Sequence, residues 1–149
     1  FIGVAEMEVC MEEVEKMLRY EFQNKKIIEV LTHSFVDVVS YKRLKFMGEP
    51  VLCLAISNHL FVTYPHLDPD QLSLLRAANI SPEKLAHIVV CSGLHLYVSH
   101  IAPPLVDQVK RFVDAVKLEN HPVAHGGSVK APMVLANIVK SVAARFTST

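Results

Sequence analysis

Residues Lys42 to Leu52 read KRLKFMGEPVL, and this stretch decides the fold because it opens the longest apolar segment of the chain. From Lys42 to Thr63, apolar residues occupy nearly every side of an expected helix. A helix that is apolar all round belongs in the middle of a helical bundle, so we expect a long central helix surrounded by the others. Pro50 lies inside it and predicts a kink near residues 46–49, because proline removes a backbone hydrogen bond and clashes with the preceding turn.

The rest of the chain also has helix patterns. Proline marks four further helix starts: Asp68-Pro69, Ser81-Pro82, Pro103-Pro104 and Ala131-Pro132. Pro65 and Gly93 are expected to end helices, and residues 121–128 are expected to form a loop. Upstream, residues 9–18 and 24–31 have helix-like apolar spacing. Since no segment alternates as a strand would, the predicted fold class is all-α.

Composition is that of one folded domain, residues 1–149, which can be a piece of a longer protein. Hydrophobic residues make up 51% of the chain and charged residues 20%, which supports a substantial core. The 15 Lys and Arg balance the 15 Asp and Glu, so no strong overall field attracts nucleic acid. No unbroken apolar run reaches the roughly 18 residues of a membrane span, so we expect no membrane partner.

Three cysteines lie far apart among apolar neighbours: Cys10, Cys53 and Cys91. We interpret them as buried free thiols in a reducing compartment, which favours an intracellular location such as cytoplasm, nucleus or plastid. His87, Cys91 and His95 are spaced by four and could ligate zinc on one helical face. Because Gly93 is expected to end the helix before His95, and no fourth ligand is evident, we expect no metal site there.

Five stretches resemble the ribonuclease III family in the family's own order. The central one is similar to the signature usually written E-R-L-E-F-L-G-D-A-V-L. The five are VEKMLRYEFQNK at 14–25, LTHS at 31–34, KRLKFMGEPVL at 42–52, LSLLRA at 72–77 and KAPMVLAN at 130–137. The sequences of residues 55–60, 64–69 and 75–79 further resemble plant ribonuclease-three-like and Dicer-like proteins. The resemblance implies the helical bundle of the ribonuclease III endonuclease domain.

Active members of that family hold magnesium with clustered acids from two helices, and the metal activates a water against double-stranded RNA. The family's acid positions correspond here to Lys42, Lys45, Glu49, Asn137 and Lys140. The four metal-binding positions, 45, 49, 137 and 140, carry two ammonium groups, one carboxylate and one neutral amide, a formal charge of +1. We therefore expect no competent catalytic residue, no bound metal and no cofactor. Glu49 is expected to accept a charge-assisted bond from Lys45 or Lys140.

The resemblance also implies partners. Family domains pair through the signature helix, so we expect a homodimer whose interface includes three residues: Phe46, Met47 and Gly48. Double-stranded RNA is a possible partner, and short basic clusters that could contact its phosphates include Lys25, Lys26 and Lys130.

Three functional hypotheses stay open on the sequence alone. The first is a catalytically degenerate ribonuclease III-like domain that acts as a dimerising scaffold, with residual affinity for double-stranded RNA. The second is an active magnesium-dependent endoribonuclease that uses other acids, such as Asp37 or Glu119, or a competent partner domain. The third is a protein accumulated or stored for another use after loss of the enzyme role.

Overall fold

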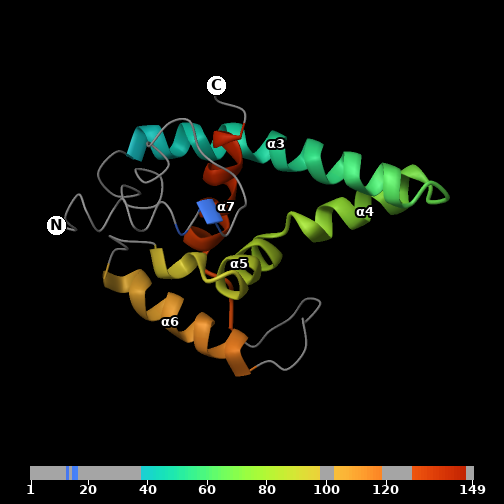
Figure 1. The fold of residues 1–149 in the computed structure, drawn as a ribbon. Helices are drawn as coiled ribbons and strands as arrows, with labels where there is room; N and C mark the ends of the chain where they lie inside the picture. The colour runs from blue at the N-terminus through green and yellow to red at the C-terminus, as the bar shows by residue number, and fades with distance from the viewer. Residues whose placement is uncertain (1–12, 14, 17–37, 98–102, 119–128, 147–149) are drawn as a thin grey trace.

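The computed structural model describes residues 13, 15–16, 38–97, 103–118 and 129–146 (Figure 1). Its elements, in chain order, are α3 Val38–Thr63, α4 Pro69–Asn79, α5 Pro82–Cys91, the short 3-10 helix η1 Leu94–Tyr97, α6 Pro103–Leu118 and α7 Met133–Arg145. Every regular element in these ranges is a helix, which confirms the all-α prediction. Most of the expected helices at 9–18 and 24–31, and the expected loop at 121–128, lie outside the described residues.

The four helix starts predicted from proline are correct, whereas α3 begins at Val38, before the predicted Lys42. Local hydrogen bonds explain the starts of α4 and α5. Asp68 caps α4 by accepting a bond from the Gln71 backbone N–H at 2.8 Å, and the Gln71 side chain accepts one from the Asp68 N–H at 3.1 Å. This reciprocal pair satisfies two backbone donors that the helix leaves free. Ser81 caps α5 with one such bond, accepting from the Lys84 N–H at 3.2 Å. Gly93, with φ of +76°, follows the end of α5 and adopts a left-handed conformation that favours glycine.

The hydrophobic core lies between α5, α6 and α7. Most of the buried apolar side chains come from these three helices, including Leu85 and Val89 of α5, Phe112 of α6, and Leu135 and Ile138 of α7. Helix α7 is the most enclosed, since eight of its 13 residues are buried. Three of these eight are alanines and one is a serine, and small side chains allow neighbouring helices to approach closely.

Helix α3 is not the central helix, so that expectation was wrong. Its first half crosses α7, but its second half extends beyond the body of the domain and pairs with α4 (Figure 1). At 26 residues it is about 39 Å long, longer than a domain of this size can surround. Leu54, Phe61 and Val62 are each at least 70% exposed. The helix runs continuously through Pro50, which is itself exposed.

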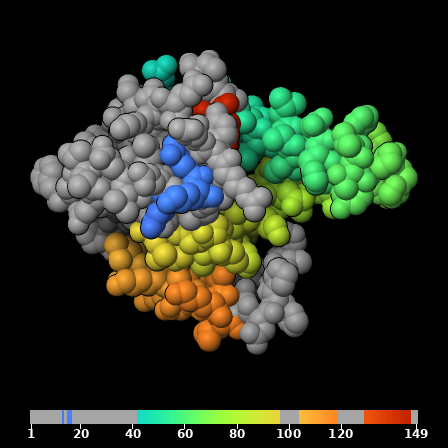
Figure 2. Space-filling view, viewed as in Figure 1, coloured from blue at the N-terminus to red at the C-terminus, as the bar shows by residue number. Residues whose placement is uncertain are grey.

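The second half of α3 and all of α4 form a projecting arm, residues 54–79, which Figure 2 shows extending away from the rest of the molecule. Helix α4 contains no buried residue. Arg76 of α4 donates to Ser57 Oγ of α3 at 3.2 Å, which ties the two helices together. Within α3, the segment of residues 42–63 is long and apolar enough to cross a membrane, judged by length and composition only. Its mean hydropathy is 1.2, and only 11% of its most apolar stretch is buried inside the molecule. A single such helix is weak evidence of a span, but it means that α3 presents an unusual amount of apolar surface.

Candidate functional site

The site begins where α3 crosses α7. Gly48 is buried at this crossing, and a Cβ atom added to it would overlap the backbone carbonyl group of Lys140 and lie 3.0 Å from Lys140 Cα. Only a residue without a side chain therefore fits at position 48. This close backbone approach places the residues beside Gly48 on α3 against the residues around Lys140 on α7.

Glu49 and Lys140 form an ion pair at this crossing. Lys140 Nζ donates to Glu49 Oε2 at 3.0 Å, across 91 residues of sequence. The Lys140 side chain is 11% exposed and the Glu49 side chain is 53% exposed, so the ammonium group is nearly buried while its partner reaches solvent. The prediction that Glu49 accepts a charge-assisted bond is confirmed, with Lys140 rather than Lys45 as the donor.

Two further polar side chains of α7 lie beside Lys140. Asn137 Oδ1 and Ser141 Oγ are buried, and neither has a hydrogen-bond partner among the residues that the structure describes. Ser141 is fully buried, at 0% exposure. They are four residues apart, so they share one face of the helix. Ser141 was missed by the sequence reasoning, since nothing in the pattern distinguishes it from the apolar residues around it.

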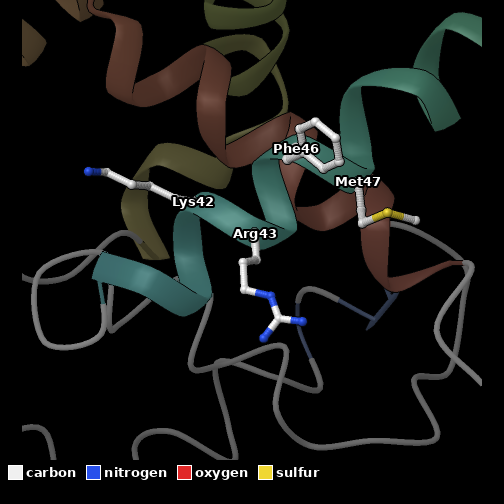
Figure 3. Close-up of a pocket in the computed structure, with 4 residues that line it drawn as sticks. All are labelled: Lys42, Arg43, Phe46 and Met47. Carbon is white, nitrogen blue, oxygen red and sulfur yellow. The ribbon is translucent and has the colours of Figure 1, made fainter.

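Phe46 and Met47 lie on the outer side of α3. They are 76% and 50% exposed, and with Lys42 and Arg43 they line a hollow of about 450 Å³. Figure 3 shows all four side chains arising from this one helix. Gly48, grouped with them from the sequence, is instead buried against α7 of the same chain.

Comparison with known proteins identifies the family. The Ribonuclease III domain model matches residues 42–146. This chain belongs to the ribonuclease III domain family. It is 50% identical over 142 residues to Ribonuclease 3-like protein 2 of Arabidopsis thaliana, covering 93% of this chain and 36% of that protein. It is 46% identical to Ribonuclease 3-like protein 2 of Oryza sativa subsp. japonica, covering 95% and 47% respectively.

A third relative is Endoribonuclease Dicer homolog 1 of Arabidopsis thaliana, 39% identical over 138 residues, which cover 87% of this chain and 7% of that protein. The chain therefore spans less than half of the length of each of these three relatives. The predicted resemblance to plant ribonuclease-three-like and Dicer-like proteins is confirmed.

The side chains at the four positions that correspond to the family's metal-binding acids, 45, 49, 137 and 140, do not fit a divalent metal. Magnesium takes oxygen ligands in near-octahedral geometry, and its charge is offset by carboxylates. Here the Lys140 ammonium lies 3.0 Å from Oε2 of Glu49, the one carboxylate of the set, so a cation already lies beside that carboxylate. The amide of Asn137 supplies a neutral oxygen only. Within the described residues, no group of three His, Cys, Asp or Glu side chains converges on a common point.

The remaining predicted residues are scattered. Lys130 is exposed and lies directly before α7, while Lys25 and Lys26 lie outside the described residues. Cys53 is half-buried, but Cys91 is exposed, so the interpretation of Cys91 as a buried thiol was wrong. Cys91 has apolar sequence neighbours because α5 packs one face on the core, yet Cys91 itself lies on the other face. His95 Nδ1 lies 3.4 Å from the Val89 carbonyl oxygen, in η1 rather than on the helix of Cys91.

Proposed function

We propose that this ribonuclease III domain is a non-catalytic, dimerising scaffold that retains weak affinity for double-stranded RNA. The observation that supports it most is the ion pair between Lys140 and Glu49, at 3.0 Å. In a catalytic member, clustered acids hold a metal that activates water and stabilises charge on the phosphate. In this chain an ammonium group already pairs with the one acid at these positions, and this pairing opposes the use of that acid as a metal ligand.

The obstacle to metal binding is the repulsion between a divalent ion and the Lys140 ammonium, and Coulomb's law gives its size. A divalent ion placed about 4 Å from a lysine ammonium would be repelled by roughly 8 kcal/mol at an effective dielectric constant of about 20. At the same distance the Glu49 carboxylate would attract the ion by about as much as the ammonium repels it, but a Glu49 that turned to the ion would release Lys140, and the nearly buried ammonium would then lose its partner. Breaking a buried pair in this way costs about 3–5 kcal/mol when both groups are buried, and less here because Glu49 is half-exposed.

Dimerisation is supported by the exposed apolar surface of α3 and α4. Phe46 and Met47 lie at one end of this surface, and Leu54, Phe61 and Leu74, each more than 70% exposed, continue it along the arm. Patches of this kind mark interaction sites on soluble proteins. A second copy, placed against α3 and α4 about a twofold axis, would bury such a patch on both chains, and a stable pairing would need about 1,000 Å² or more in total.

Affinity for RNA is supported by exposed basic side chains at two places in the chain. Lys42 and Arg43 of α3 and Lys130 before α7 are exposed. Each phosphate contact contributes a salt-dependent attraction that needs no metal. Since the chain has a net charge of +0, we expect this affinity to be weak and to vanish as salt is raised.

The test of the proposal is cleavage of long double-stranded RNA in magnesium or manganese, beside an active family member. The unmodified domain should leave the RNA intact, and calorimetry should detect no magnesium binding. A variant carrying Lys45→Glu, Glu49→Asp, Asn137→Asp and Lys140→Glu should bind magnesium, although Pro50 can still misplace the first pair. Cleavage by the unmodified domain that requires magnesium and is abolished by Glu49→Gln would refute the proposal.

A second candidate is an active endoribonuclease, and one observation favours it: a relative 39% identical to this chain is named an endoribonuclease. On that hypothesis, acids outside the described residues, or a partner domain, would supply the metal ligands. The two candidates separate when the domain is mixed with an active relative. If a dead variant of the relative regains cleavage only when this chain is added, the chain contributes catalytic groups and the second candidate replaces the first.

A further inference from the structure

The two crossing helices carry a local excess of positive charge. Together, α3 and α7 contain five basic side chains and one acidic side chain, a net charge of +4, whereas the whole chain has a net charge of +0. The basic residues are Lys42, Arg43, Lys45, Lys140 and Arg145, and the acid is Glu49. A local excess of one sign of charge attracts ions of the opposite sign even when the whole molecule is neutral. The crossing is therefore a place where an anion is favoured.

Two of these lysines share a face of α3 with Glu49. Positions 42, 45 and 49 are three and four residues apart, so their side chains project from one side of the helix. Glu49 pairs with Lys140 at 3.0 Å, yet its side chain is 53% exposed, so this side of the helix is open to solvent. Lys42 is exposed and Lys45 is half-buried, and neither forms an ion pair with any residue that the structure describes. These two ammonium groups can therefore take an external anion as their partner.

The second half of α3 has the opposite character. Residues 50–67 contain no Lys, Arg, Asp or Glu, and the one Lys or Arg of the arm, Arg76, donates to Ser57 Oγ. Figure 1 shows that the first half of α3 lies at the crossing with α7, whereas the second half extends away from it. Affinity for a polyanion grows with the number of phosphates that Lys and Arg neutralise. A polyanion is therefore attracted to the first half of α3 and not to the arm.

We propose that double-stranded RNA lies across the face of α3 that carries Lys42, Lys45 and Glu49, and that the two lysines contact its backbone phosphates directly. This inference rests on the proposed affinity for double-stranded RNA and gives that affinity a location. A lysine ammonium donates charge-assisted hydrogen bonds to phosphate oxygens, and this contact needs no metal. Positions that hold acids elsewhere in the family thus bind phosphate here through ammonium groups. Magnesium, which competes with lysine for the phosphates, weakens this binding instead of supporting it.

The test measures the binding of a fluorescently labelled RNA duplex by anisotropy, in EDTA, over a range of salt concentrations. Lys42→Gln and Lys45→Gln each remove one positive charge without introducing a carboxylate. We expect each variant to bind about tenfold more weakly at about 50 mM salt, and to lower the slope of log affinity against log salt by about one. The double variant should lower that slope by about two. Millimolar magnesium, added at constant ionic strength, should weaken binding by the unmodified protein.

The matched control is Lys110→Gln, which removes the same charge from α6. Lys110 is exposed, but Asp107 and Asp114 lie one helical turn away on either side of it. Figure 1 shows α6 on the other side of the domain from α3. This variant should bind RNA with the affinity and the salt dependence of the unmodified protein.

Failure of this inference is distinguishable from failure of the proposed function. If the unmodified protein binds no duplex at low salt, the proposed affinity for RNA is wrong, and this location for it is wrong as well. If it binds, but Lys42→Gln and Lys45→Gln match Lys110→Gln in affinity and salt slope, the affinity stands and the location is overturned. Loss of binding in EDTA would also overturn the proposal. Circular dichroism checks the helix content of each variant, and if Lys45→Gln does not fold, the exposed Lys42→Gln decides alone.

Discussion

Replacing Gly48 with alanine is the sharpest test of how α3 and α7 are held together. The added methyl group would overlap the Lys140 carbonyl group and lie 3.0 Å from Lys140 Cα. The nearest obstacle is the Lys140 carbonyl oxygen, and non-bonded atoms pack at about 3–4 Å, so the two helices must separate by more than about 1 Å. The obstacle is backbone on both sides, and backbone cannot rotate away as a flexible side chain does. The helices must therefore move as units.

The cost follows from these contacts. Overpacking a core strains a protein by about 1–3 kcal/mol, and the rigid obstacle here places Gly48→Ala at about 3 kcal/mol. Alanine favours the helix over glycine by about 1 kcal/mol, which offsets part of the strain. We expect a net loss of about 2 kcal/mol from a free energy of unfolding that is about 5–15 kcal/mol for a domain of ordinary stability.

The assay is urea unfolding followed by circular dichroism, and Gly93→Ala is the matched control. Gly93 has φ of +76°, and a Cβ added there would meet nothing within 4 Å. Gly93→Ala should therefore lower the free energy of unfolding by only about 1–2 kcal/mol, because alanine is strained in the left-handed conformation and meets no clash. Gly48→Ala should also pull Glu49 from Lys140. Adding Glu49→Gln should therefore lower the free energy of unfolding further in the Gly93→Ala protein, where the ion pair is intact, but not in the Gly48→Ala protein. A Gly48→Ala protein within about 0.5 kcal/mol of the parent would refute the close-crossing argument.

Three further predictions use the same residues and their neighbours. Glu49→Gln should lower the free energy of unfolding by about 1–2 kcal/mol, which lies between the values for exposed and buried ion pairs. Adding Lys140→Met should restore part of this loss, because the ammonium left without a partner is removed. If urea unfolding shows that the two losses add, the ion pair does not contribute to stability. Asp68→Ala should cost about 1 kcal/mol in the stability of α4, seen as faster hydrogen exchange of the α4 amides, and unchanged exchange would show that the capping box contributes nothing. Phe46→Glu should convert a dimer to a monomer in analytical ultracentrifugation without loss of helix content, because the side chain is 76% exposed in the single chain, whereas a persistent dimer would place the interface elsewhere.

The local part of the fold could be predicted from the sequence. Asp68 and Ser81 cap helices through bonds to residues three positions away, and proline in the first turn needs no distant partner. Such signals lie within one turn, so the sequence is enough to place the starts of α4, α5 and α7. The buried face of α6 also follows the spacing of its apolar residues, since Phe112 and Val116, which are four positions apart, are both buried.

Features that depend on distant residues could not be predicted in the same way. The apolar character of α3 predicted burial, but it did not say how far the helix would extend past its neighbours. The sequence alone left two candidate donors to Glu49. Lys45 is one helical turn away, whereas Lys140 is 91 residues away and comes close only because the helices cross at Gly48. The exposure of Cys91 depends on which face of α5 meets the core, and a run of apolar neighbours conceals that face.

The α3–α7 crossing combines two features that are physically independent. The close approach at Gly48 is a matter of backbone volume, and it requires nothing of the side chains at the family's acid positions. A cluster of four carboxylates at this crossing would repel itself, so a fold that keeps them depends on a cation to hold α3 beside α7. In this chain the cation is covalently part of α7, as the Lys140 ammonium, and it is matched to the one carboxylate that remains. The close backbone approach at Gly48 and the ion pair beside it therefore hold α3 against α7 in this chain, and this crossing of the ribonuclease III fold does not depend on four carboxylates.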